Sequence, residues 1–241
     1  MCTVSFISKN DTYFVTSNRD EHISRPSAFV PKEDTINGRK ITYPKDPKAG
    51  GTWFAINDNG GVVVLLNGAF EKHISTGNYT RSRGLIVLEI SSNANPIAYL
   101  DEIVLENIEP FTLVVFENGT LVEFRWDGVT KHLKKLSVTE NYIWSSATLY
   151  TAASRQNRED LFKVFLKEKA ALKASDVIDF HTNYNDKENG FVIDRETGLK
   201  TFSVTQAILN TNGICLDHLN LLAHNTKHSI AIKIPEETNS I

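Results

Sequence analysis

The first 22 residues, MCTVSFISKNDTYFVTSNRDEH (1–22), decide the fold because they hold two alternating runs around a short polar segment. Residues 2–8 and 12–18 each change side-chain character from one position to the next, the period-2 pattern of a β-strand with two different faces. Asn10 and Asp11, between the runs, tolerate the left-handed backbone of a tight turn. The segment therefore predicts an antiparallel β-hairpin.

The register of this hairpin decides which polar residues meet at its open end. A two-residue or a four-residue loop would place Cys2 opposite Arg19, whereas a three-residue loop would oppose Cys2 to Asn18 or Asp20. In the first register Glu21 follows on the face of Arg19, and Asn18 and Asp20 lie on the other face. Because paired residues have their Cβ atoms about 4.5–5.5 Å apart, we expect a cysteine and an arginine to be neighbours at an open strand end.

A second hairpin is predicted at Asp58-Asn59-Gly60-Gly61, between the apolar runs 52–57 and 62–67. Asn-Gly between such runs is the strongest short hairpin signal. A two-residue loop at Asn59-Gly60 would pair Thr52 with Asn67, a polar residue at the end of an apolar strand. If the two hairpins lie side by side, Asn67 can approach Cys2.

The rest of the chain alternates between strand and helix patterns. Residues 24–50, rich in Pro, Lys and Asp, are expected to be a long surface connection with one short strand at 40–43. Helices are expected at 82–91, from Pro96 onward, at 154–168 and at 175–182. Strands are expected at 111–126 with a turn at Asn118-Gly119, and at 129–136 and 141–146. Strand character returns in 190–209 and 229–234, with turns at Glu196-Thr197-Gly198 and Asn212-Gly213. This order predicts an α+β domain of antiparallel sheets covered by helices, formed by residues 1–241 as a single domain.

Composition narrows the classes of function. The chain has 241 residues, a net charge of −3 and no basic excess, so we expect no nucleic-acid partner. No apolar run approaches the ~20 residues of a membrane span, and polar residues interrupt the start where a signal peptide would be apolar. Two cysteines are too few for a disulfide framework, which favours a reducing, cytoplasmic location. The seven histidines show no ligand spacing, and we expect no metal and no cofactor.

The residues at the predicted hairpin end suit nucleophilic catalysis. Removal of Met1 would give Cys2 a free α-amine with a pKa of about 7.7–8, a base attached to the nucleophile itself. The guanidinium of Arg19 would raise the thiolate fraction of Cys2. An amide N–H of Asn67 could stabilise a developing oxyanion.

Several stretches together resemble a known family. MCTVSF (1–6), SNRDE (17–21), SRPS (24–27), GGTWFAI (50–56) and LLNG (65–68) are similar to the NRDE family, also called the transport and Golgi organisation protein 2 family. Residues 81–84, 143–158 and 198–209 resemble later blocks of the same family. That family is similar in fold to N-terminal nucleophile (Ntn) hydrolases of the penicillin V acylase and bile salt hydrolase type. The resemblance therefore implies a four-layer αββα sandwich of antiparallel sheets covered by helices.

The resemblance also implies catalytic roles. Those amidohydrolases use an N-terminal Cys, an Arg and an Asp at the end of the second strand, and Asn side chains near the oxyanion. Cys2 fits the nucleophile, Arg19 with Asp20 or Glu21 resembles the strand-end pair, and Asn67 fits one Asn. Which of the two acids takes the carboxylate's role stays open.

Four further residues are expected to contact the substrate. Arg81 and Arg83 stand beside a predicted helix start, where an anionic group binds well. Asn18 belongs to the strand-end motif, and Lys200 stands where the hydrolases carry a later Arg.

Two functions follow as hypotheses. The first is an N-terminal cysteine amidohydrolase that opens the C–N amide bond of a small-molecule substrate through a thioester on Cys2. The alternative is a non-catalytic carrier that binds haem, lipid or acyl-CoA, amphipathic ligands with which members of the resembling family have been associated.

Overall fold

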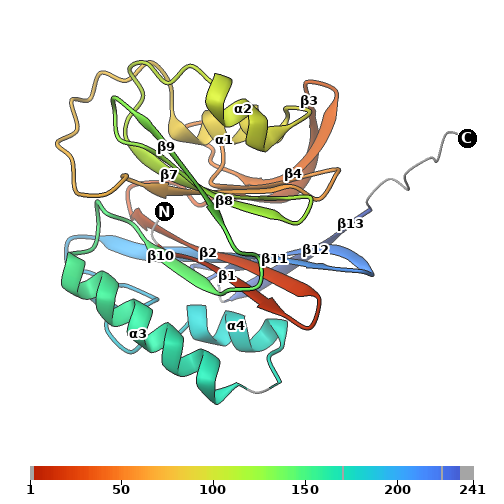
Figure 1. Cartoon of the computed structure of the whole chain (residues 1–241). Helices are drawn as coiled ribbons and strands as arrows, with labels where there is room; N and C mark the ends of the chain where they lie inside the picture. The colour runs from red at the N-terminus through yellow and green to blue at the C-terminus, as the bar shows by residue number, and fades with distance from the viewer. Residues whose placement is uncertain (1–2, 170, 224, 234–241) are drawn as a thin grey trace, which may run out of the picture.

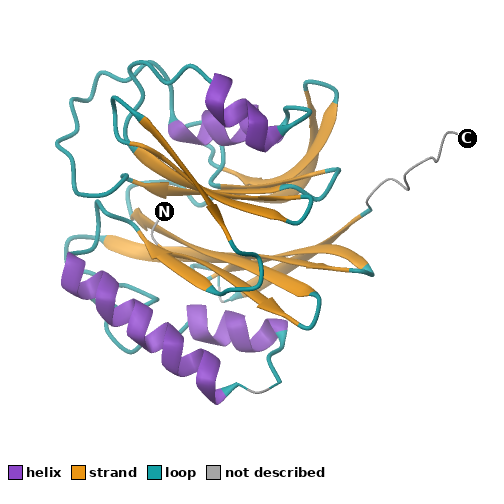
Figure 2. Ribbon diagram, viewed as in Figure 1, coloured by secondary structure: helices purple, strands orange, loops and turns teal. Residues whose placement is uncertain are grey.

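Two antiparallel sheets lie face to face, and a pair of helices covers the outer face of each (Figure 1, Figure 2). The computed structural model describes residues 3–169, 171–223 and 225–233. The predicted α+β class and the four-layer αββα arrangement are confirmed. No helix in this described part of the chain is long and apolar enough to cross a membrane.

The six-stranded sheet has the N-terminal hairpin near its centre. In spatial order its strands are β10 (Tyr142–Ser145), β1 (Thr3–Lys9), β2 (Thr12–His22), β11 (Leu199–Asn210), β12 (Gly213–Asn220) and β13 (Thr226–Ile232). The long β2 pairs on one side with β1 and on the other with β11, so both of its edges are covered.

The seven-stranded sheet follows the chain order without a crossover. Its strands are β3 (Phe29–Ile36), β4 (Arg39–Lys45), β5 (Phe54–Asn57), β6 (Val62–Asn67), β7 (Phe111–Glu117), β8 (Thr120–Trp126) and β9 (Lys131–Leu136). Helices α1 (Arg83–Ser91) and α2 (Pro96–Glu102) cover its outer face, and α3 (Ala152–Glu168) and α4 (Ala174–His181) cover the six-stranded sheet (Figure 1). All four helices lie where the sequence predicts them.

The first hairpin has the predicted register. Its two-residue loop places Asn10 and Asp11 at φ of 49° and 57°, the left-handed region that short polar side chains tolerate. Lys9 pairs with Thr12, and the ladder runs without a bulge to Thr3 opposite Asn18. The predicted next pair involves Cys2, which lies outside the described residues.

The register predicted for the second hairpin is wrong by one residue. Phe54 pairs with Val64, so Thr52 does not face Asn67. The side chain of Asn57 accepts hydrogen bonds from the backbone N–H groups of residues 59 and 61, and Gly60 has a φ of 83°. This asparagine therefore closes a three-residue turn, where the sequence pattern alone favours a two-residue one.

The expected long connection at 24–50 is wrong in part: the short strand expected at 40–43 lies within β4, but β3 was not expected. Strands β3 and β4 form a hairpin around Asn37-Gly38, whose φ values of 51° and 78° fit a two-residue turn. The charged residues Lys32, Glu33 and Asp34 hid this strand because an edge strand carries charges that a central strand does not. In the stretch 190–209, β11 begins at Leu199, directly after the turn predicted at 196–198, whereas the described residues before that turn, also expected to have strand character, form no strand of their own.

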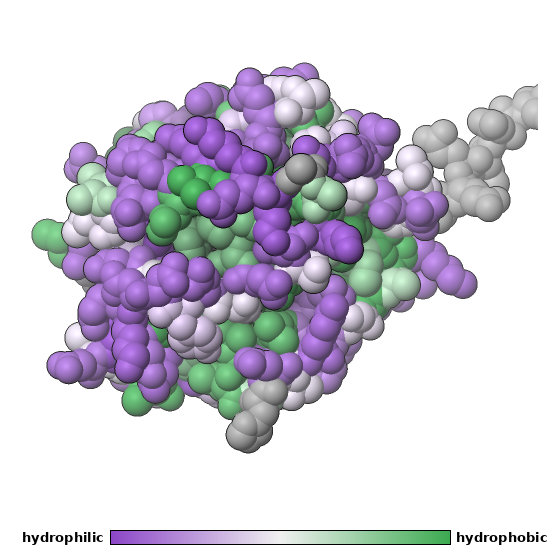
Figure 3. Space-filling model, turned by 90° about the horizontal axis from the view of Figure 1, so that it is seen from below, coloured by the Kyte–Doolittle hydropathy of each residue, from purple (hydrophilic) through white to green (hydrophobic). Residues whose placement is uncertain are grey.

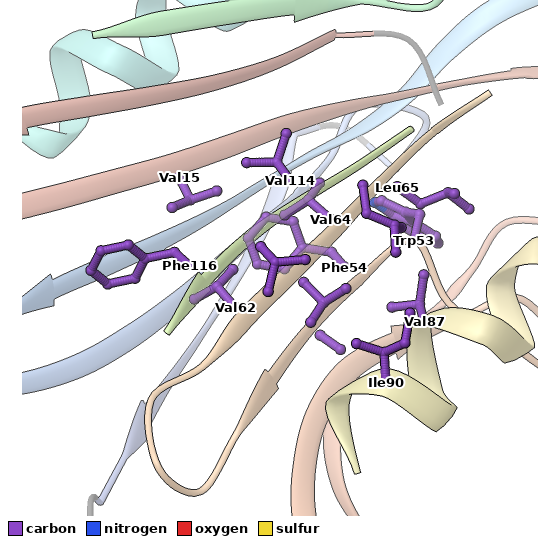
Figure 4. Packing of buried hydrophobic residues seen from close by; sticks show 14 of the residues in the cluster. Val15, Trp53, Phe54, Val62, Val64, Leu65, Val87, Ile90, Val114 and Phe116 are labelled. Atoms are coloured by element: carbon purple, nitrogen blue, oxygen red, sulfur yellow. The ribbon is translucent and has the colours of Figure 1, made fainter. Parts of the chain in front are cut away.

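The core lies mainly between the two sheets. The rings of Phe6, Tyr13 and Phe116 meet there with centroids 4.8–5.7 Å apart. Figure 4 shows Val15 near Phe116 between the sheets, and Val87 of α1 in the part of the core next to that helix. The strand alternation predicted from the sequence therefore turns apolar side chains of both sheets toward each other, and they form one shared layer.

A second, smaller core lies under α3 and α4. The rings of Phe162, Phe180 and Phe191 pack together against the six-stranded sheet. Helix α3 leaves Leu161 and Val164 partly exposed, and the face that carries α3 and α4 mixes hydrophilic and hydrophobic residues (Figure 3).

A buried polar network joins this helical layer to β2. Asn18 donates from Nδ2 to the carbonyl oxygens of His181 (2.8 Å) and Phe191 (2.9 Å), and its Oδ1 accepts from His181 Nδ1. His181 Nε2 then accepts from the hydroxyl of Ser5 at 2.7 Å. Burial, with a smaller contribution from the charge of Arg158, lowers the pKa of His181 to about 3. The neutral imidazole is therefore part of the folded structure.

Two glycines let α1 approach the start of β5. A Cβ atom on Gly51 would lie 2.3 Å from the backbone carbon of Gly84, and one on Gly84 would lie 2.9 Å from the carbonyl oxygen of Thr52. The backbone N–H of Thr52 donates to the Gly84 carbonyl at 3.2 Å. This contact fixes the beginning of the helix against the sheet.

We expect Gly51→Ala to destabilise the fold by about 1–3 kcal/mol, because a methyl group would force two backbones apart. Gly77→Ala is the control, since its Cβ would meet open space and only the positive φ of 74° would cost about 1 kcal/mol. Urea unfolding measures both. Equal losses for the two variants would contradict the close backbone contact.

We expect stability to fall as the pH drops below about 6.5. The folded-state pKa values of His181 and His218, about 3 and about 4, lie below the ordinary value of 6.5 because both rings are buried. The unfolded chain therefore binds these protons first, and unfolding becomes easier by ~4 kcal/mol between pH 7.5 and 5. Urea unfolding at the two pH values measures this drop. His181→Asn should remove about half of it, and an undiminished drop in this variant would contradict the assignment.

Candidate active site

A cavity of about 130 Å³ opens where β2 ends, beside the segment before β5, the end of β6 and the start of α1. Its polar lining combines three arginines and two carboxylates with an indole ring, an amide and two hydroxyl groups. These side chains are Arg19, Arg25, Arg83, Glu21, Asp46, Trp53, Asn67, Ser82 and Thr52. We call this cavity the arginine pocket.

Arg19 is the central residue of the arginine pocket. Its side chain is 1% exposed, and its guanidinium carbon lies 4.9 Å from the ring centre of Trp53 and 5.3 Å from that of Phe202. Nη2 lies 2.9 Å from Asp46 Oδ2 and 3.6 Å from Glu21 Oε2. The guanidinium is therefore clamped between two rings and held from one edge.

Asp46 holds two arginines at once. Arg25 Nη2 lies 2.8 Å from the same Oδ2 atom that Arg19 contacts, while Oδ1 accepts from the backbone N–H groups of residues 48 and 49. Burial alone would raise the pKa of Asp46, but the Ala49 N–H and the charges of Arg25 and Arg19 lower it below its ordinary value. The carboxylate therefore stays ionised and orders the positive side chains around it.

Asn67 reaches the arginine pocket from the last position of β6. The backbone carbonyl oxygen of Asn67 accepts a hydrogen bond from the hydroxyl of Ser146 at 2.9 Å. This bond ties the end of β6 to the segment that follows β10 in the other sheet. The structure therefore brings Asn67 to the cluster of Arg19 even though the predicted hairpin register is wrong.

The two arginines at the start of α1 differ in position. Arg83 lines the arginine pocket, and its guanidinium lies 2.8 Å from Glu109 Oε2 and donates to the Pro110 carbonyl at 3.1 Å. Burial lowers its pKa, an effect that the charge of Glu109 opposes. Arg81 does not line the pocket, since it pairs with Glu89 and donates to the Val104 carbonyl.

Two other residues predicted to contact substrate lie elsewhere. The side chain of Asn18 is buried in the network with His181, on the face of β2 that is turned to the helices. Lys200 pairs with Asp194 at 2.9 Å and sits opposite Glu21 in the ladder, and it does not line the arginine pocket.

The two acids of the strand-end motif lie on opposite faces of β2. Glu21 lines the arginine pocket, whereas Asp20 is 3% exposed and is turned to the helical layer. Asp20 accepts hydrogen bonds from the hydroxyl groups of Tyr150 at 2.8 Å and Thr201 at 2.5 Å. Strand alternation therefore gives the two carboxylates separate environments.

Arg158 is a residue that the sequence analysis did not select. Its side chain is 1% exposed, its guanidinium carbon lies 3.6 Å from the ring centre of Tyr150, and it donates to the hydroxyl of Thr3 and to the Gly190 carbonyl. Within the described residues Arg158 has no carboxylate in salt-bridge distance. One sequence signal could have identified it: Arg158 lies four residues before the buried Phe162, which puts a charged residue on the buried face of α3.

Of the two cysteines, Cys2 lies outside the described residues. Cys215 on β12 is partly buried, and burial followed by the charge of Asp217 raises its pKa. Among the described residues, no group of three or more His, Cys, Asp or Glu side chains could hold a metal ion.

Three solved structures with a similar fold are those of hydrolases. An orthologue of N-acylethanolamine-hydrolyzing acid amidase from Caenorhabditis elegans matches with a TM-score of 0.61 at 12% identity, over 85% of this chain and 92% of that chain. Two variants of the conjugated bile acid hydrolase from Clostridium perfringens match with TM-scores of 0.55 and 0.52, at 10% and 9% identity, over 100% and 98% of both chains. These likenesses confirm the fold expected from the sequence, that of Ntn hydrolases.

The sequence comparison gives the family. No curated protein matches the sequence at a significant level. The family model described as Transport and Golgi organisation 2 matches residues 1–124, more than half of the 241 residues. This range contains β1 to β6 and every side chain named above as lining the arginine pocket. The chain therefore belongs to the Transport and Golgi organisation 2 family.

Proposed function

We propose that this protein is an N-terminal cysteine amidohydrolase that cleaves a C–N amide bond of a small molecule. The observation that supports this most is the arginine pocket itself, which gathers Arg19, Glu21 and Asn67 at the open end of the β1–β2 hairpin. The matched hydrolase structures have the same fold, which raises the expectation of this chemistry without assigning a substrate.

The hairpin register supports Cys2 as the nucleophile. Thr3 pairs with Asn18, so one further step of the same ladder would pair Cys2 with Arg19. Val4 and Phe6 belong to the core between the sheets, and Arg19 contacts Trp53 on this same side of β2. Cys2 itself lies outside the described residues, and its pairing with Arg19 stays the prediction made from the sequence.

The proposed reaction begins after Met1 is removed. The α-amine of Cys2 takes the thiol proton, and the thiolate attacks the amide carbonyl carbon, so that an S–C bond forms and the carbonyl becomes an oxyanion. The Asn67 amide N–H donates to that oxyanion. The C–N bond then breaks, and the leaving amine takes the proton from the α-ammonium group. Water adds to the thioester, releases the carboxylic acid and returns the thiol.

Residues on both faces of β2 would support the reaction. The cation of Arg19 would raise the thiolate fraction of Cys2. Asp20, on the other face, would accept a hydrogen bond from the α-ammonium group, because a carboxylate accepts about four hydrogen bonds. Arg158 contacts Thr3 and Tyr150, and its positive charge would further favour a thiolate at the neighbouring residue. Glu21 would orient Arg19 and Arg25, with which it forms ion pairs.

The size of the arginine pocket disfavours this pocket as the site of a haem or lipid carrier. Pockets for drug-sized ligands and cofactors measure about 300–1,000 Å³. The arginine pocket, at about 130 Å³, suits one end of a small molecule. The carrier remains the second hypothesis, and its test is titration with haemin and acyl-CoA.

We expect Met1 to be absent from the purified protein and Cys2 to be alkylated by iodoacetamide at pH 7 at least ten times faster than Cys215. The pKa of Cys215 is raised by burial, so little of it is thiolate at this pH. Peptide mass spectrometry measures both the N-terminus and the labelling rates, with Cys2→Ala and Cys215→Ser as controls. Retention of Met1 on the protein would rule out the mechanism.

We expect Asn67→Ala to lower the rate of amine release from N-acyl amides by about 100- to 1,000-fold, the usual effect of losing one oxyanion donor. Alkylation of Cys2 by iodoacetamide should change less than threefold, because that displacement forms no oxyanion. Asn212→Ala, in the exposed turn after β11, is the control and should leave both rates unchanged. Equal losses of hydrolysis and alkylation in Asn67→Ala would assign Asn67 a structural role instead.

A further inference from the structure

We infer that the arginine pocket binds an anionic group of the ligand, either a carboxylate or a phosphate. This group is distinct from the oxyanion that forms on the amide carbonyl during the proposed reaction. This inference rests on the proposed function in one respect only, the identification of the ligand as the substrate of the hydrolase. In that case the amide that is cleaved belongs to an anionic molecule. The binding itself does not depend on catalysis.

The first support is a concentration of buried polar atoms without hydrogen-bond partners. Within the described residues, eight buried side-chain nitrogen and oxygen atoms lack a partner. Four of the eight belong to side chains that line the arginine pocket: Arg19 Nη1, Arg25 Nε, Trp53 Nε1 and Ser82 Oγ. Buried polar groups are nearly always satisfied, so four such atoms around one cavity indicate a missing partner.

The chemistry of these atoms indicates that the partner is an acceptor. The guanidinium and indole nitrogens can only donate, and the Ser82 hydroxyl can donate as well. The carboxylates nearby do not satisfy them, since Glu21 Oε2 is 3.7 Å from Arg25 Nε and Asp46 binds the other edges of the guanidinium groups. A carboxylate or phosphate group supplies several acceptor atoms from one small group.

The charged groups of the lining leave donors free for an anion. Arg83 is paired with Glu109, while Arg19 and Arg25 share Asp46 and Glu21 and each keeps one nitrogen without a hydrogen-bond partner. Arg19 is 1% exposed and stacked between Trp53 and Phe202, so its free edge is already oriented before a ligand arrives. Ser82 is the N-cap of the nine-residue helix α1, and its side chain makes no capping hydrogen bond. The partial positive charge of this helix end adds to the same effect.

The three tryptophans provide a direct test. Trp126 Nε1 donates to the Ile108 carbonyl at 2.9 Å, and Trp144 Nε1 donates to Glu123 Oε2 at 2.6 Å. Trp53 Nε1 has no partner among the described residues. A ¹H–¹⁵N spectrum of the indole groups should therefore show one signal that responds to ligand and two internal controls.

The titration uses the full-length Cys2→Ala protein, so that hydrolysis cannot change the ligand. The probes are N-acetylglycine and inorganic phosphate at constant ionic strength, with the neutral N-acetylglycinamide as control. We expect the Trp53 signal to shift in a saturable manner with at least one anion and not with the neutral amide. Tighter binding of N-acetylglycine would indicate a carboxylate, and tighter binding of phosphate would indicate a phosphate group.

A pair of matched variants separates binding from structure. Ser82 and Ser91 both have buried hydroxyl groups without a partner, at opposite ends of α1. Ser82→Ala should weaken anion binding about five- to tenfold, and Ser91→Ala should leave it unchanged. If no anion shifts Trp53, if the neutral amide shifts it equally, or if both variants bind like the parent, the inference is overturned. The proposed hydrolysis would still stand or fall by the mass of the N-terminus and the rate of amine release.

Discussion

The burial of one guanidinium group organises this end of the sandwich. Arg19 is 1% exposed, and a buried charge is tolerated only where partners compensate it. Asp46, from the segment after β4, supplies the countercharge, and Trp53, from the segment before β5, supplies the ring. Both come from the part of the chain that forms the opposite sheet. The requirement to neutralise one side chain of β2 thus brings loops of the seven-stranded sheet over the end of the six-stranded one.

The alternation of β2 then separates two environments that the sequence presents as one motif. Arg19 and Glu21 face the arginine pocket, while Asn18 and Asp20 face the helices. The second environment is also charged, because Arg158 reaches from α3 to the hydroxyl of Thr3 and stacks on Tyr150. The end of the first hairpin is therefore bordered by a cation on each side of the sheet.

The sequence predicted the elements that depend on local signals. The four helices and the first hairpin follow from caps, periodicity and turn residues, and the register of β1 with β2 follows from a two-residue loop. The second hairpin is present where the sequence predicts it, but its register was wrong because the side chain of Asn57, not the Asn-Gly pair alone, sets the turn. Asp46 could not be selected, since its role comes from a contact with a residue 27 positions away. The sequence could at most place Arg158 on the buried face of α3, because its contact with Thr3 spans 155 positions. Local sequence patterns cannot reveal contacts between residues so far apart in the chain.

The backbone contact between Gly51 and Gly84 has a consequence for how specificity can change in this family. Because α1 is held against the start of β5 at that point, the wall on that side of the arginine pocket cannot retreat to admit a bulkier molecule. Room can be gained only by altering the side chains or lengths of the segments around the opening, such as 46–49. Divergence of ligand preference among relatives should therefore appear as loop remodelling over an invariant frame.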